Sequence, residues 1–136
     1  MSLSSVKRFF RKYPLACICL LAIWYLCLFK PPHTRLSEIT NFDKVVHVTM
    51  YLGTCSIIWW EYLRSHNRMH WGKLALLAVV APILMSGLIE LAQAYLTTNR
   101  SGDWIDFAAN SVGVLLAALV GCFVLPRFIH SRKVTQ

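Results

Sequence analysis

The sequence predicts an all-α, polytopic membrane protein, a bundle of four transmembrane helices with the N and C termini in the cytoplasm. Hydrophobic residues make up 57% of the 136 residues, and the mean hydropathy is +0.52. The apolar residues form four runs, each near the length of about 20 residues that crosses a bilayer. These runs occupy nearly the whole chain, so we expect one membrane domain over residues 1–136.

The positions of the basic residues predict the orientation of the bundle. A net charge of +8 is also typical of a nucleic-acid surface, but here Lys and Arg gather in the two tails and in the loop at residues 64–73. The other side holds only Lys30, Arg35, Lys44 and Arg100. Cytoplasmic segments carry the excess of Lys and Arg, so we expect both termini inside, the two remaining loops outside and no nucleic-acid partner.

The first span is predicted at about residues 13–29, after a basic start. A basic start and an apolar core are also typical of a signal peptide. No small-x-small cleavage site precedes Lys30, and Pro31 and Pro32 end the helix. We therefore expect an uncleaved span, with a helical start as early as Phe9.

The second span is predicted at about residues 43–63. Asp43 at its start suits the positive end of a helix dipole. Trp59, Trp60 and Tyr62 near its end are typical of the aromatic belt at a membrane interface.

The third and fourth spans are predicted at about residues 74–96 and 104–125. Pro82 and Gly87 are candidate kinks within the third span, which neighbouring helices can tolerate. Pro126 is expected to end the fourth span, because proline cannot continue the hydrogen bonding of a helix.

Three helix faces carry polar residues at the outer ends of the last three spans. Spacings of three or four residues place the members of each set on one face. The sets are Asp43, His47 and Tyr51 in the second span, Glu90 and Gln93 in the third, and Asp103, Asp106, Asn110 and Gly113 in the fourth. Lys44 and Arg100 add two cations. Polar groups at membrane depth face the bundle interior or a wet cavity, so we expect one outward-facing pocket.

His47, Glu90 and Asp106 are the candidate catalytic residues of this pocket. His47 can act as a general base that Asp43 orients from one turn away, or it can be an interfacial histidine bonded to a carboxylate. Asp106 lies nearly a turn inside its span, where a role at the helix terminus explains it less well.

Among the acidic residues, Glu90 is the one for which a purely structural role is the weakest explanation. It lies inside an apolar run, where a charge costs about 2.5 kcal/mol or more unless it is paired or wetted. The structural alternative is an ion pair with Arg100 or Lys44, which would still place both partners in the pocket.

The remaining candidates are expected to bind a ligand. They are Asp43, Lys44, Tyr51, Gln93, Arg100, Asp103 and Asn110. Arg100 suits a phosphate or carboxylate. For Asp43 and Asp103 the alternative is stabilisation of a helix N-terminus, and for Gln93 and Asn110 it is hydrogen bonding between helices.

A pocket without metal or cofactor is the favoured interpretation. His47 with Glu90, Asp103 or Asp106 would offer one nitrogen and several carboxylate oxygens, a set that suits a hard divalent ion better than zinc. The five cysteines lie within apolar runs and have no ligand spacing, so we expect buried thiols.

The polar motifs resemble the VanZ-like family of small bacterial membrane proteins. They are DKVVHVTMYLG at 43–53, ELAQ at 90–93 and RSGDWIDFAANSVG at 100–113. The family pattern is an Asp-Lys-x-x-His-x-x-x-Tyr start to one span, a Glu and Gln ending another, and Arg, two Asp, Asn and Gly leading the last. The resemblance covers roughly residues 43–121.

The resemblance implies a multi-pass protein of the bacterial cytoplasmic (inner) membrane. The family is named after a member that gives resistance to teicoplanin, an antibiotic that acts on cell-wall precursors at the outer membrane face. We therefore expect the pocket to recognise or modify a membrane lipid or lipid-linked envelope precursor. The resemblance brings no accepted catalytic activity, so the choice between an enzyme and a binding protein stays open.

Two alternative functions remain. The chain can be a non-catalytic scaffold or assembly partner, and an oligomer could form through the small-residue face of Gly113, Ala117 and Gly121. A small transporter is disfavoured because the inner halves of the spans hold few polar residues.

Overall fold

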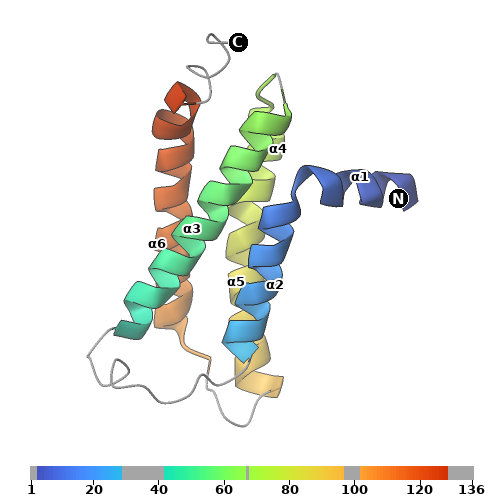
Figure 1. Ribbon diagram of the computed structural model, residues 1–136. Coiled ribbons are helices and arrows are strands. Elements are labelled where there is room, and N and C mark those ends of the chain that lie inside the picture. The colour runs from blue at the N-terminus through green and yellow to red at the C-terminus, as the bar shows by residue number, and fades with distance from the viewer. Residues whose placement is uncertain (1–2, 29–41, 67, 97–101, 129–136) are drawn as a thin grey trace.

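The computed structural model describes residues 3–28, 42–66, 68–96 and 102–128. All the regular elements of these segments are helical, and long helical rods lie side by side, with the short helix α1 projecting sideways from the start of α2 (Figure 1). The elements are α1 (Leu3–Lys12), α2 (Pro14–Leu28), α3 (Phe42–Ser65), α4 (Trp71–Ala75), η2 (Leu76–Val80), α5 (Ala81–Leu96), α6 (Trp104–Leu119) and η3 (Val120–Val124). Each predicted span is thus helical over its described residues, except for Tyr13 at the start of the first. The third begins at Trp71, earlier than expected.

Two of the rods have the length and composition of membrane spans. They are Trp71–Leu96, with mean hydropathy 2.3, and Trp104–Phe128, with mean hydropathy 2.2. Helix α2 is apolar but shorter, at 15 residues, and α3 carries charged residues near both ends. Large apolar side chains such as Leu84 and Phe123 are exposed on the rods, which suits contact with hydrocarbon more than with water.

Both prolines within the long rods follow a π-helical turn. Pro82 comes after η2 and Pro126 after η3, so the residue four before each proline lies inside the widened turn. Such a turn relieves the loss of the proline N–H and the clash of its ring with the preceding turn. The expectation that Pro126 ends the fourth span is therefore wrong, because the helix continues to Phe128.

The N-terminal segment is helical, but it is not a straight extension of the first span. Helix α1 points away from the bundle, and the chain turns between it and α2 (Figure 1). The break falls at Tyr13, and Pro14 opens α2. Proline disfavours helical backbone at the preceding residue, which explains the bend. The expected helical start near Phe9 therefore belongs to a separate helix.

Helix α2 is held at its start by a carboxylate from another helix. Glu61 of α3 is buried and accepts hydrogen bonds from the backbone N–H groups of Leu15, at 2.9 Å, and Ala16, at 3.1 Å. These N–H groups lack partners within their own helix, and a negative charge also suits the helix dipole. Glu61 therefore acts as a remote cap.

The small-residue face of α6 packs against α3 within the chain. A Cβ added at Gly113 would lie 2.5 Å from the carbonyl oxygen of Val48 and 3.0 Å from the Cβ of Tyr51. A Cβ at Gly121 would overlap the ring of Trp59. Glycine therefore lets the two helices approach closely, as the small-xxx-small pattern predicts for a neighbouring helix.

We predict that Gly113→Ala lowers the free energy of unfolding by about 1–3 kcal/mol, because the new methyl group forces α3 and α6 apart. Gly53→Ala is the matched control, since a Cβ at Gly53 meets nothing within 4 Å. It should leave stability unchanged or raise it by up to about 1 kcal/mol through helix propensity. Thermal unfolding of the two variants in detergent measures the difference. Equal stability of the two variants would contradict the close contact.

Candidate functional site

A cluster of polar side chains lies where α3 and α6 begin and α5 ends, at the lower end of the bundle in Figure 1. We call it the polar cluster. Its members are Asp43, Lys44 and His47 of α3, Ser86 and Glu90 of α5, Asp103 directly before α6, and Asp106 and Asn110 of α6. Interactions among these residues join three helices.

Lys44 links α3 to the start of α6. Its ammonium donates hydrogen bonds to Asp103 Oδ2, at 2.8 Å, and to Asp106 Oδ1, and it lies 4.0 Å from Asp43 Oδ2. Asp103 also caps α6, because its Oδ1 accepts from the backbone N–H of Ile105 at 2.8 Å.

The Lys44 ammonium holds the pKa of the Asp103 carboxyl below its ordinary value, and the hydrogen bond from Ile105 acts in the same direction. A lowered pKa in the folded state stabilises the fold at neutral pH. This contribution is lost as the pH falls through the lowered pKa.

His47 is joined to α6 and α5 by a chain of hydrogen bonds. Asn110 Nδ2 donates to Ser86 Oγ at 2.8 Å, and Asn110 Oδ1 faces His47 Nδ1 at 2.9 Å. In this orientation of the amide, Nδ1 donates the hydrogen bond to Asn110, and Nε2 is the ring nitrogen that points away from it. All three side chains are buried.

The free nitrogen of His47 faces two carboxylates. Its Nε2 lies 3.6 Å from Asp106 Oδ2 and 3.8 Å from Asp43 Oδ2. Both distances exceed the usual range of a hydrogen bond. Nε2 is therefore available to accept a proton or to bind a cation.

Glu90 joins the cluster through the backbone. Its Oε2 accepts from the N–H of Asp103 at 2.9 Å, while its buried Oε1 has no hydrogen-bond partner among the described residues. Gly102 makes this approach possible, because a Cβ there would overlap the carbonyl oxygen of Glu90. The predicted alternative of an ion pair with Lys44 is not what the described residues form, since the lysine binds aspartates.

The family comparison agrees with the motifs that build the cluster. A family model described as VanZ/LLP1 matches residues 5–125. The chain belongs to the VanZ-like family. The match begins in α1, so it extends well beyond residues 43–121. No curated protein and no solved structure matches the chain.

Three predicted site residues of this VanZ-like chain lie apart from the cluster's hydrogen bonds or outside the described residues. Tyr51 is fully buried in the apolar core, and its hydroxyl lies near Ser86 of the cluster without forming a hydrogen bond of regular geometry with the described residues. Gln93 Nε2 donates to the carbonyl oxygen of Cys27 at 2.7 Å, near the end of α2. Arg100 lies outside the described residues.

Sequence reasoning missed Ser86, although a signal was present. Ser86 lies four residues before Glu90, so it is on the same helix face as Glu90 and Gln93. Serine is a common residue in apolar helices, and its role became visible only through its contact with Asn110.

We predict that Asn110→Ala lowers the free energy of unfolding by about 1–3 kcal/mol, because it leaves buried polar groups of His47 and Ser86 unpaired. Ser111→Ala is the control. Its hydroxyl bonds only to the carbonyl of its own helix, so the effect should stay within about 0.5 kcal/mol. Nitrogen-15 NMR of labelled histidine should show the Nδ1-protonated ring of His47 in the wild type and its loss in Asn110→Ala. A wild-type His47 protonated at Nε2 alone would contradict the proposed hydrogen-bond chain.

Proposed function

We propose that this chain is a four-span protein of the bacterial cytoplasmic membrane, with both termini inside and the polar cluster near the outer face. Helices α2 and α3 and the two long rods are the proposed spans. The cluster would then lie at the depth of lipid headgroups, where it would meet the polar part of an amphiphile.

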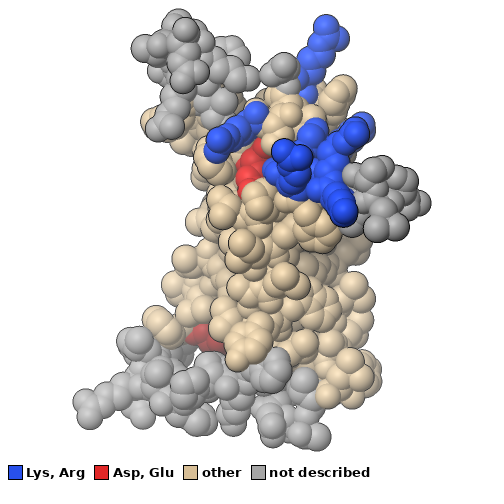
Figure 2. Space-filling view, turned by 45° about the vertical axis from the view of Figure 1, so that its right-hand side comes forward, with Lys and Arg blue, Asp and Glu red and all other residues tan. Residues whose placement is uncertain are grey.

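The distribution of charge supports this orientation. Among the described residues, the basic side chains other than Lys44 belong to α1, to the last turn of α3 and the segment from there to η2, and to the end of the last rod. Figure 2 shows Lys and Arg gathered near one end of the molecule, above a broad surface of residues other than Lys, Arg, Asp and Glu. An excess of Lys and Arg is typical of the cytoplasmic side.

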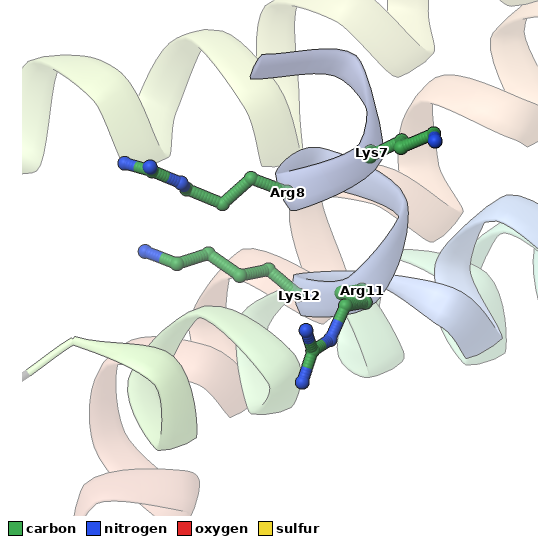
Figure 3. Close-up of a pocket in the computed structure, with 4 residues that line it drawn as sticks. All are labelled: Lys7, Arg8, Arg11 and Lys12. Carbon is green, nitrogen blue, oxygen red and sulfur yellow. The ribbon is translucent and has the colours of Figure 1, made fainter. Parts of the chain in front are cut away.

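Helix α1 adds a basic surface at that end. Lys7, Arg8, Arg11 and Lys12 line a hollow of about 450 Å³. In Figure 3, Arg8 and Lys12 extend to one side of the helix and Lys7 to the other. Phe9 and Phe10 are exposed on the same short helix. This composition suits a helix that lies in the interface of the inner leaflet and attracts anionic lipids.

We predict that a reporter enzyme active only outside the cytoplasm is inactive when fused after Gln136 and active when inserted at Thr98. The reason is the bias of Lys and Arg toward the termini. Enzyme activity in whole bacterial cells, normalised to the amount of fusion protein, makes the measurement. The opposite pattern would overturn the proposed orientation.

We propose further that the polar cluster recognises or modifies a membrane lipid or a lipid-linked envelope precursor, and so affects sensitivity to glycopeptides such as teicoplanin. The observation that carries this proposal is the position of His47 Nε2, which makes no hydrogen bond of normal length to the described residues. Asn110 and Ser86 position it, and two carboxylates surround it. A buried histidine held in this orientation is suited to accept a proton from a bound group.

Individual residues would have separate roles in this function. His47 and Asp106 would handle a proton, and Glu90 would use its unpaired oxygen to accept a hydrogen bond. Lys44 would hold an anionic headgroup, with Arg100 as the second cation. In a purely binding protein the same groups would shield a surface target without a chemical step.

A structural role is the second candidate function, and a specific observation favours it. Lys44 and its two aspartates are paired with one another and tie α3 to α6. A scaffold or assembly partner would need these pairs for stability and would tolerate the loss of the free nitrogen of His47.

We predict that wild-type protein changes the lipid or precursor profile of a deletion strain, and that His47→Gln and Glu90→Gln abolish the change. Mass spectrometry of membrane lipids, with teicoplanin sensitivity measured in parallel, makes the comparison. Thr49→Ala is the control, because that exposed hydroxyl bonds only to the carbonyl of Val45. It should keep the wild-type profile.

The enzyme version fails if wild type, His47→Gln and the deletion strain share one profile at equal protein abundance. A scaffold predicts a different dependence. It tolerates His47→Gln and Glu90→Gln and loses function only with changes such as Gly113→Ala that disturb the packing of α3 on α6, whereas the enzyme version loses function with all three.

A further inference from the structure

We propose that Asp43, His47 and Asp106 bind a divalent cation such as Zn²⁺ or Mn²⁺. The inference rests on the proposed function and names a metal for the same site; with the ion bound, His47 Nε2 is a ligand, so His47 then helps to bind the headgroup instead of accepting a proton. It departs from the sequence-based expectation of a metal-free pocket. One ligand atom from each of the three side chains lies within 4.8 Å of the others, from residues in two helices.

The spacing of the ligand atoms suits one coordination shell. His47 Nε2 lies 3.6 Å and 3.8 Å from the two carboxylate oxygens, too far for hydrogen bonds. Ligands about 2.0–2.1 Å from a tetrahedral metal are separated by ~3.3 Å. Small rotations of the aspartate side chains would bring the three atoms to this separation, and Asp43 is exposed enough to move.

The position of His47 Nε2 suits a metal ligand. Nδ1 of the ring faces Asn110 Oδ1 at 2.9 Å, so Nε2 is the nitrogen directed at Asp43 and Asp106. Nε2 and one oxygen of each carboxylate then form a compact set of three donor atoms. Ser86 in turn orients Asn110, so the histidine has the outer-shell support typical of metal ligands.

The charge of the polar cluster also favours a second cation. Among the described residues at this end of the bundle, four carboxylates accompany one ammonium. The acids are Asp43, Glu90, Asp103 and Asp106. Lys44 offsets one of these charges. A divalent ion would offset two more at a depth where unpaired charge is costly.

Lys44 and the cation can occupy the cluster together. The lysine binds Oδ1 of Asp106, whereas Oδ2 of the same carboxylate faces His47. Lys44 is also 4.0 Å from Asp43 Oδ2, so its charge weakens binding of the ion without taking its place.

The chemistry of the site follows from its three protein ligands. Three protein ligands leave at least one coordination position open on a divalent ion, and a set of one nitrogen and two carboxylate oxygens suits a harder ion such as Mn²⁺ better than zinc. An anionic oxygen of a phosphate or carboxylate headgroup fits that position. The substrate class that we infer is therefore an anionic amphiphile bound through its headgroup.

The test uses full-length protein without a polyhistidine tag, purified in detergent and stripped with a chelator. We expect equilibrium dialysis against ZnCl₂ or MnCl₂, read by elemental mass spectrometry, to give one ion per chain. His47→Gln, Asp43→Asn and Asp106→Asn should each weaken binding by about tenfold or more. His70→Gln is the matched control, because that exposed histidine lies at the other end of the bundle, and it should bind like wild type.

Several outcomes would overturn the proposal. One is wild-type binding below one ion per chain at saturating metal. Another is an equal loss of binding in His70→Gln and His47→Gln, which would indicate surface binding. A third is binding in Lys44→Met but not in wild type, which would make Lys44 the resident cation.

The folding of the variants and the proposed function are tested separately. Asp43→Asn changes an exposed side chain, so its thermal unfolding without metal should match wild type while its metal binding falls. A chain that binds no metal but still changes the lipid profile would overturn this inference and leave the proposed function standing.

Discussion

The polar cluster depends on the close contact of α6 with α3 at Gly113. The backbones meet there with no room for a side chain on α6. Toward the start of α6, the same approach lets Asn110 reach His47 at 2.9 Å and Lys44 reach Asp103 at 2.8 Å. A wider separation would leave these buried groups unpaired. A buried polar group without a partner has lost its hydrogen bonds to water, and this penalty exceeds the net stabilisation that a typical hydrogen bond provides. The polar cluster can therefore form only because α6 has a small residue where it contacts α3.

Polar side chains also hold α2 at both ends. Glu61 of α3 accepts from N–H groups of its first turn, and Gln93 of α5 donates to the carbonyl of Cys27 near its last turn. Both helix ends carry backbone groups with no partner in their own helix, and neither end can rely on water inside an apolar bundle. The carboxylate of Glu61 and the amide of Gln93 thus have a structural role, because each binds backbone groups at one end of α2. A polar residue at membrane depth therefore indicates a functional site only after such roles have been assigned.

The sequence predicted the helices well and the partners of individual side chains less well. Apolar runs and the 3.6-residue period gave four helices and placed Asp43, His47, Asp106 and Asn110 on converging faces, because both signals are local. The bend at Tyr13 and the continued helix after Pro126 follow from local backbone geometry that periodicity does not report. The roles of Ser86, Glu61 and Gln93 depend on residues 24 to 66 positions away. A single sequence carries no signal for such pairs.

The irregular parts of the two long rods lie away from the polar cluster. The turn η2 precedes α5 and η3 follows α6, whereas the cluster uses the later part of α5 and the first turns of α6. A π-helical turn before each proline absorbs its distortion within one half of its rod, so the half that carries Glu90 or Asp106 remains regular. The proposed site needs His47 near two carboxylates, and side chains on regular helices are held in place more accurately than side chains on distorted ones. The rods can therefore contain prolines without disturbing the cluster, because the prolines distort only the halves of the helices that carry none of its residues.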